Sequence, residues 1–415
     1  MSSVREAAIA AKKVSGDLAA FSTEKKNRIL LKIADYLRDN KPYILSANAE
    51  DIHLGEKNGL NQTLIDRLSL TEERIEDIAK GVEQVASLPD PIGVVLSEWD
   101  TAAGLHIQKV RVPFGVLGII YEARPNVTID AAVLSIKSGN VALLRGSSSA
   151  LNSNRALTKI VQDALEVEGV ARESVQLLDA AGYEATQEMM QLRGLIDVLI
   201  PRGGASLIKS VVEMAAVPVI ETGAGNCHVY IHKDGDVEMA KKIVLNAKIQ
   251  RPSVCNALET LLVHQEWAKK YLKDIVEALQ EKRVECRGCE EACQIVKSLK
   301  AATTQDWETE FLDYILAIKI VDSEEAAIEH INHYGTKHSE AIITQSEEVA
   351  EKFMQYVDAA AVYQNASTRF TDGFVFGFGA EIGISTQKLH ARGPMGLCEM
   401  TSYKYKIFGK GEVRS

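Results

Sequence analysis

Apolar residues follow two different periods along the chain, and the change of period predicts the order of the elements. Up to about residue 90 they recur at steps of three and four, as in Ile75, Ile78, Val82 and Val85, which is typical of amphipathic helices. From Phe114 onward, short runs that are apolar throughout alternate with helical patterns. Such strands, separated by helices of roughly 10 to 15 residues, indicate a parallel sheet covered on both faces. We therefore expect an α/β fold.

The strands and helices fall into two sets, which predict two α/β domains with a break near residues 221–227. The first set has strands expected at 114–121, 141–144, 175–178, 198–200 and 217–220, and helices at 128–138, 150–165, 183–191 and 205–215. The second set has strands expected at 228–231, 257–263, 316–321, 341–343 and 360–363, and helices ending at 248 and spanning 266–281, 324–332 and 347–356.

Two segments depart from this pattern. Residues 104–112 alternate apolar with polar side chains and carry Lys109 and Arg111, which fits a ribbon with one solvated face better than a core strand. Residues 403–408 predict one further short strand near the end of the chain.

Composition narrows the class of protein. The 415 residues are 46% hydrophobic and 25% charged, which is typical of a soluble globular protein. A net charge of −10 without a basic run argues against nucleic-acid binding. The chain has no apolar run of the roughly 18 to 20 residues that a membrane span needs. Six cysteines and no signal-peptide pattern predict the reducing cytoplasm.

Cys255 is a candidate nucleophile. It lies on a loop between a predicted helix and a predicted strand, with Arg251 nearby. A cysteine close to a cation loses its proton more easily, and the thiolate is the reactive form. The alternative is that Cys255 is a small core residue.

Asn126 follows the first predicted strand, at the edge of the sheet where ligands bind in such folds. Its amide could stabilise a developing oxyanion. Equally, it could cap the helix expected from residue 128.

Two strand ends carry groups that suit a phosphate. Arg145 is followed by Ser147 and Ser148 where a helix is expected to begin, so a cation, hydroxyls and the helix dipole coincide there. Gly203 and Gly204 begin another helix in a way that suits a pyrophosphate, although a full GxGxxG motif is missing. The serines could instead serve as plain helix caps.

Cys286, Cys289 and Cys293 form an incomplete zinc pattern, because no fourth ligand lies at a usual spacing. We predict a solvated loop or the start of a helix there, and no metal.

Seven sequence blocks resemble the aldehyde dehydrogenase superfamily and, in finer detail, its γ-glutamyl phosphate reductase family. Together they occur in order along nearly the whole chain. The blocks are YEARPNVT (121–128), PRGG (201–204), ETGAGNCH (221–228), QRPSVCN (250–256), NASTRF (365–370), GFGAEIGIST (377–386) and RGPMGL (392–397).

This resemblance implies an aldehyde-dehydrogenase-like fold and a domain plan. A Rossmann-type cofactor domain would comprise 1–96 and 114–223, and an α/β catalytic domain 224–384. A small β oligomerisation flap would comprise 97–113 and 400–411 and would hold a dimer or tetramer together. It also implies NADPH-dependent reduction of L-glutamyl 5-phosphate to L-glutamate 5-semialdehyde through a cysteine thioester, in proline biosynthesis. Channelling of the acyl phosphate from glutamate 5-kinase is left open.

Matched position by position, the resemblance implies roles for individual residues. Cys255 would be the nucleophile and Asn126 the oxyanion donor, while Arg145 and Glu310 would contact the two riboses of the cofactor. Ser148 stands where NAD-preferring relatives tend to keep a glutamate, which favours NADPH. Glu221 matches the base that activates water in ordinary aldehyde dehydrogenases, a role that this reaction does not need.

The leaving phosphate needs a cation, and the candidates are Arg124, Arg251 and Arg369. Sequence spacing does not choose among them.

Three rival functions remain: an aldehyde oxidiser of the same fold, a thiol hydrolase using Cys255, and a non-catalytic scaffold.

Overall fold

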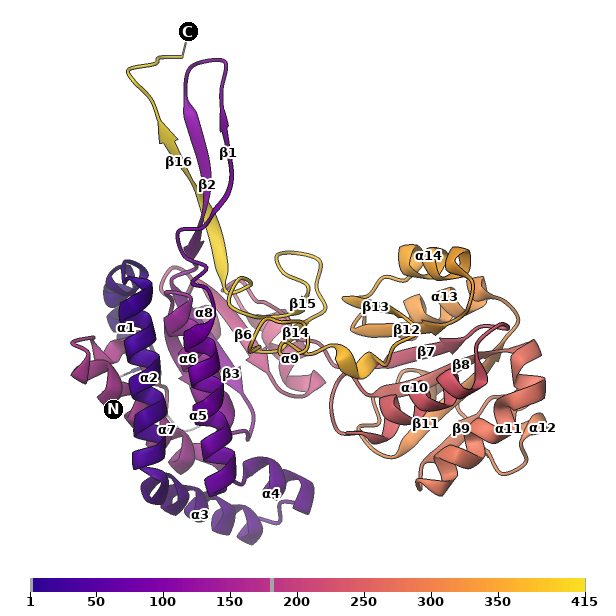
Figure 1. Ribbon diagram of the computed structural model, residues 1–415. Helices are drawn as coiled ribbons and strands as arrows, with labels where there is room; N and C mark the ends of the chain where they lie inside the picture. The colour runs from indigo at the N-terminus through magenta and orange to yellow at the C-terminus, as the bar shows by residue number, and fades with distance from the viewer. Residues whose placement is uncertain (1–2, 180–182, 415) are drawn as a thin grey trace. The chain divides into compact units, whose positions relative to one another are not determined.

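The computed structural model describes residues 3–179 and 183–414, which form two compact units (Figure 1). The first unit contains the described residues up to Thr222, Gly377–Gly383 and those from Met395 onward. The second contains Gly223–Phe376 and Ile384–Pro394. Each unit has its own parallel sheet with helices between the strands, so the α/β class is confirmed. The functional roles of the domains stay predictions.

The sheet of the first unit has four parallel strands in the order β5-β4-β3-β6. The strands are β3 (Val116–Tyr121), β4 (Val141–Arg145), β5 (Val175–Leu177) and β6 (Val198–Arg202). The helices that follow them are α6 (Asn126–Lys137), α7 (Leu151–Val167), α8 (Tyr183–Gln191) and α9 (Ala205–Met214). Every residue of β3 and β4 is buried, as expected for strands covered on both faces.

Helices precede this sheet, as predicted for the first 90 residues. They are α1 (Val4–Ala19), α2 (Thr23–Asp39), α3 (Lys41–Lys57), α4 (Gln62–Leu68) and α5 (Glu72–Ser87). In α2, Ile29, Ile33 and Leu37 are fully buried at the spacing of one helix face, and the helix packs against α5. Among the described residues, every helix is too short or too polar to cross a lipid bilayer.

The ribbon predicted from alternation is part of a three-stranded antiparallel sheet, which stands out from the rest of the first unit in Figure 1. Its strands are β1 (Val95–Asp100), β2 (His106–Pro113) and β16 (Thr401–Phe408). The strand expected at 403–408 is thus confirmed and begins two residues earlier. The sheet exposes large apolar side chains, among them Trp99, Tyr405 and Phe408.

The second unit is built on a seven-stranded parallel sheet in the order β10-β9-β11-β8-β7-β12-β13. Its strands are β7 (Cys227–Ile231), β8 (Leu258–His264), β9 (Glu285–Gly288), β10 (Lys300–Ala301), β11 (Ile315–Val321), β12 (Ser339–Ile343) and β13 (Ala361–Gln364). Its helices are α10 (Val237–Ile249), α11 (Gln265–Glu281), α12 (Glu290–Ile295), α13 (Glu324–Tyr334) and α14 (Glu347–Tyr356). Helices α10 and α11 share one buried apolar cluster with the sheet, and α13 and α14 share another.

Two details of the fold differ from the prediction. Residues 217–220 make only a single parallel bridge, between Leu199 and Val219, because Pro218 has no N–H to extend a ladder. For the segment with three cysteines, the solvated loop is wrong at Cys286, which is buried within β9, but the start of a helix is confirmed: Cys289 is the N-cap residue of α12, and Cys293 lies within that helix. Burial raises the pKa of Cys286 to about 12.

A buried ion pair links α10 to β8 in the second unit. Lys248 Nζ lies 2.6 Å from Glu259 Oε2, and both side chains are fully buried. Burial lowers the pKa of Lys248 and raises that of Glu259 to about 7. Glu259 Oε1 also accepts a hydrogen bond from Leu312 N at 3.1 Å, where the backbone has a positive φ of 54°. The pair therefore fixes the loop that carries Glu310.

We expect Lys248→Met to lower the free energy of unfolding by about 3 to 5 kcal/mol, because it leaves the Glu259 carboxylate buried without a cation. Urea unfolding followed by tryptophan emission would measure this, since Trp267 and Trp307 lie in the same unit. Adding Glu259→Gln removes the unpaired charge and should recover at least half of the loss. A double variant as unstable as Lys248→Met would contradict this account.

Candidate active site

Cys255 lies on the loop between α10 and β8, before the amino end of a central strand. Its residue is half-buried, in contrast to the fully buried Cys227. A turn closes over it, with Ala257 N donating to Val254 O at 3.0 Å. The thiol of Cys227 donates a hydrogen bond to Cys255 O at 3.2 Å, which ties the loop to the start of β7. Cys255 is therefore a loop residue with partial access to solvent and not a member of the apolar core.

The segment before β7 packs directly against this loop. A Cβ atom on Gly225 would lie 1.4 Å from Cys255 O, so glycine alone permits this approach. Gly225 N donates to Glu310 Oε1 at 2.7 Å. Glu310, the residue expected to bind a cofactor ribose, and the loop of the candidate nucleophile therefore both contact the backbone at Gly225. Sequence analysis placed Gly225 at the domain break and in the ETGAGNCH block, and its double contact is visible only in the fold.

Two of the three candidate arginines also belong to this unit. Arg251 is exposed on the Cys255 loop, and Arg369 lies half-buried on the 3₁₀ turn η4 (Thr368–Phe370). Desolvation and then the Arg251 cation hold the pKa of Arg369 below its usual value, while the negative charge of a Cys255 thiolate acts the other way. Arg369 is therefore within electrostatic range of both the Cys255 sulfur and the Arg251 cation. Arg124 is part of the first unit.

Asn126 is the first residue of α6, and Pro125 occupies the N-cap position. The alternative of a capping side chain is therefore wrong. Instead, Asn126 Nδ2 donates to Asp130 Oδ2, one turn later, at 3.1 Å. Desolvation raises the pKa of Asp130 to about 6, against the effect of this bond and of Arg202. Sequence reasoning missed Asp130, although an acid four residues after Asn126 on a largely apolar helix was a usable signal.

The end of β4 carries the hydroxyls and the guanidinium for which a phosphate contact was predicted. Ser147 accepts a hydrogen bond from Ser149 N and so begins the 3₁₀ turn η1 (Ser148–Ala150), which leaves Ser148 exposed. Arg145 is buried beside it, and burial lowers its pKa while the Asp179 carboxylate raises it. A hydroxyl and a guanidinium thus stand where a ribose phosphate could bind.

The start of α9 is already occupied by a carboxylate. Gly204 N donates to Glu122 Oε1 at 2.9 Å, and a Cβ on Gly203 would lie 2.6 Å from the Glu122 carboxyl carbon. The predicted pyrophosphate contact at Gly203 and Gly204 therefore requires Glu122 to move aside, because two anions repel each other there.

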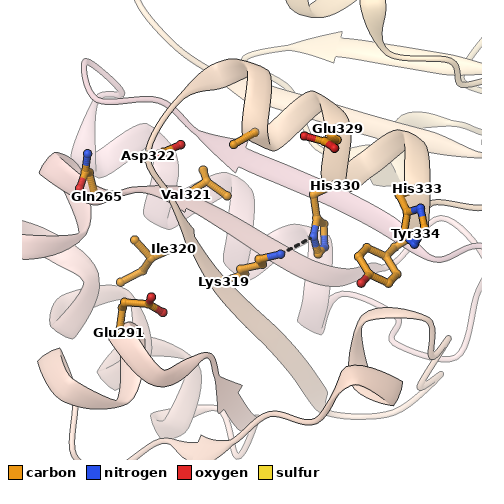
Figure 2. A pocket seen from close by; sticks show the side chains of 11 residues that line it. Gln265, Glu291, Lys319, Ile320, Val321, Asp322, Glu329, His330, His333 and Tyr334 are labelled. Carbon is orange, nitrogen blue, oxygen red and sulfur yellow. Dashed lines mark hydrogen bonds between the residues drawn. The ribbon is translucent and has the colours of Figure 1, made fainter.

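A cavity of about 600 Å³ lies elsewhere on the second unit (Figure 2). Lys319 Nζ lies 3.0 Å from His330 Nδ1 in its wall, and burial lowers the pKa of His330 far below its usual value. The cavity includes Val321, at the carboxyl end of β11, whereas Cys255 precedes the amino end of the parallel neighbour β8. It is therefore separate from the nucleophile. Among the described residues, no group of three or more histidines, cysteines or acids could hold a metal ion.

Comparisons with known proteins agree with one another. A family model described as "Aldehyde dehydrogenase family" matches residues 1–303. The chain is 57% identical to the γ-glutamyl phosphate reductase of Enterococcus faecalis, over 98% of this chain and 97% of that protein. It is 54% identical to that of Halalkalibacterium halodurans over the full length of both.

Solved structures give the same picture. The γ-glutamyl phosphate reductase of Thermotoga maritima superposes with a TM-score of 0.98 at 47% identity and covers 100% of both chains. An acetylating aldehyde dehydrogenase from Geobacillus thermoglucosidasius has a TM-score of 0.71 at 18% identity, covers 99% of this chain and 97% of its own, and shares the fold.

Proposed function

This chain belongs to the aldehyde dehydrogenase family, and we propose that it is a γ-glutamyl phosphate reductase: it reduces L-glutamyl 5-phosphate to L-glutamate 5-semialdehyde in proline biosynthesis and releases phosphate. The observation that carries the chemistry is the half-buried Cys255 on its loop, backed by Gly225 and within electrostatic range of Arg369. This arrangement provides a nucleophile and a cation for an anionic leaving group.

In the mechanism, the Cys255 thiolate attacks the γ-carbonyl carbon and forms a carbon–sulfur bond. Asn126 donates its amide to the oxyanion, with its side chain oriented by Asp130. The carbon–oxygen bond to phosphate then breaks, and its electron pair leaves with the phosphate, so a thioester remains on Cys255. When bound, a nicotinamide cofactor, for which Arg145, Ser148 and Glu310 are the proposed contacts, would supply the hydride for reduction of this thioester. Release of the semialdehyde restores the thiolate.

We propose NADPH as that cofactor. Ser148 is exposed at the end of β4, beside Arg145, and the nearby Asp179 is neutralised by Arg155 at 2.9 Å. A 2′-phosphate would therefore meet a guanidinium and a hydroxyl without an unpaired carboxylate.

Ser148→Glu should reverse this preference. We expect the KM for NADPH to rise at least about tenfold, because the new carboxylate repels the 2′-phosphate, while the KM for NADH stays level or falls. Steady-state kinetics with both cofactors would measure it, with Ser148→Gln as the uncharged control. An unchanged NADPH KM in Ser148→Glu would place the 2′-phosphate elsewhere.

Asn126→Ala should lower kcat by about 10²- to 10³-fold, which is typical for the loss of one oxyanion donor. The KM for the cofactor should change little. A loss of less than fivefold would assign Asn126 a purely structural role on α6.

The proposal extends to assembly and compartment. The exposed apolar side chains of the β1-β2-β16 sheet support a homo-oligomer, since such a surface is costly in water. A reducing cytoplasm would keep the six free cysteines, including Cys255, as thiols.

Phosphate-dependent reduction of NADP⁺ by glutamate semialdehyde tests the proposed function. We expect the steady rate to rise from near zero and to saturate as inorganic phosphate is added. A steady rate that is independent of phosphate would indicate an aldehyde oxidiser instead.

A further inference from the structure

The turn that carries Arg369 is fastened to the residue next to the nucleophile. Asn256 Nδ2 donates to Thr371 O at 2.9 Å and to Arg369 O at 3.3 Å. In return, Thr368 Oγ1 donates to Asn256 O at 2.8 Å. Asn256 is 6% exposed, so water competes little for these bonds. Three hydrogen bonds therefore hold the backbone at Arg369 in register with the backbone at Cys255.

A second contact directs the guanidinium itself. Arg369 Nε donates to Gln250 Oε1 at 2.7 Å. Gln250 is the C-cap residue of α10, at the start of the Cys255 loop. Because Nε takes this bond, the plane of the guanidinium is set from the same loop that carries the thiol. The two Nη groups remain geometrically suited to a bidentate contact with an anion.

Of the two candidate arginines in this unit, Arg251 is exposed on the loop, whereas the Arg369 guanidinium is bound to Gln250. Arg369 is half-buried, where an ion pair is screened less by solvent than at an exposed site. Its position beside a second cation also favours an anion that carries more than one negative charge, as phosphate does.

We propose that Arg369 is the residue that makes this enzyme specific for an acyl phosphate, and that Gln250 and Asn256 are positioning residues that hold its guanidinium beside Cys255. The inference rests on the proposed function and deepens it. In the step concerned, the sulfur–carbon bond forms and the carbon–oxygen bond to phosphate breaks. The electron pair of that bond goes to the phosphate oxygen, and the Arg369 guanidinium stabilises the resulting negative charge. No oxidation or reduction occurs in this step.

The test is the reverse reaction, with the KM for inorganic phosphate measured separately from the KM for NADP⁺. We expect the phosphate KM to rise about 100-fold in Arg369→Gln and about tenfold in Gln250→Leu and Asn256→Ala. Gln250→Asn keeps an uncharged amide acceptor and should lose less phosphate affinity than Gln250→Leu, whereas Gln250→Glu would add a carboxylate that repels phosphate. The NADP⁺ KM and the rate of Cys255 alkylation by iodoacetamide should change less than about threefold in Gln250→Leu, which a collapsed loop would not allow.

Arg251→Gln is the matched control, since it removes a charge from the same region. A phosphate KM that rises in Arg251→Gln and stays level in Arg369→Gln would overturn the assignment of Arg369. Equal losses of phosphate binding, NADP⁺ binding and alkylation in Gln250→Leu would reduce Gln250 to a structural residue and overturn its positioning role. Wild-type enzyme that needs no phosphate would remove the proposed function as well, which separates the two failures.

Discussion

Turnover should fall by about 10⁶-fold in Cys255→Ala, the loss expected when a covalent nucleophile is removed. In the proposed mechanism the thioester forms on the Cys255 sulfur alone. Without that sulfur, neither phosphate release nor hydride transfer can proceed. Coupled assays in both directions would measure the residual rate. The fold should persist, because Cys255 is half-buried on a loop and contributes little to the core.

Cys398→Ala is the matched control. Cys398 is exposed and lies in the first unit, so its loss should leave turnover within about twofold of the wild type. Cys255→Ser tests the thiolate more narrowly, since a hydroxyl of similar size is a much weaker nucleophile. Near-normal turnover in Cys255→Ala would end the covalent mechanism.

Gly225→Ala should lower kcat/KM by at least about 100-fold, although it adds only one methyl group. The new Cβ would start 1.4 Å from Cys255 O, and normal contact requires about 3.5 Å, so the nucleophile loop must shift by about 2 Å. A displacement of about 1 Å already costs roughly 10²-fold when it misaligns reacting atoms. The same shift strains the bond from Gly225 N to Glu310, so the cofactor KM should rise too.

The control for this variant is Gly81→Ala in α5. A Cβ on Gly81 meets no atom within 4 Å, so the substitution should stabilise the helix by up to about 1 kcal/mol and leave kinetics unchanged. Alkylation of Cys255 by iodoacetamide would report the loop shift in Gly225→Ala directly. Wild-type kinetics in Gly225→Ala would show that the loop tolerates displacement and that its packing is not catalytic.

Much of the fold follows from local pattern. Long amphipathic helices can be predicted because burial of one face gives the apolar residues a helical period. Strands buried on both faces can be predicted because they are short runs of apolar residues. The missed elements are short and mixed in polarity: β9 reads Glu-Cys-Arg-Gly, and Cys286 is buried because the strand pairs with β10 and β11 and its side chain packs in an apolar cluster. The strand wrongly expected at 217–220 contains a proline, whose missing N–H limits pairing more than its apolar neighbours favour it.

The site divides in the same way. Cys255 and Asn126 could be selected from residue type and place in the α/β pattern, and the family resemblance gave them roles. The contacts that support the Cys255 site could not be predicted, because they join segments that are far apart in the sequence. These contacts are Gly225 with Glu310, and Gln250 with Arg369. Such contacts depend on tertiary structure and leave no periodic trace in the sequence.

The central claim is that a thioester forms on Cys255 and waits for phosphate. Rapid mixing of the enzyme with NADP⁺ and glutamate semialdehyde, without phosphate, tests it most directly through nicotinamide absorbance. The account predicts a burst of one NADPH per active cysteine, then a halt, then steady turnover once phosphate is added. Continuous NADPH formation before phosphate is added, or an undiminished burst in Cys255→Ala, would contradict it.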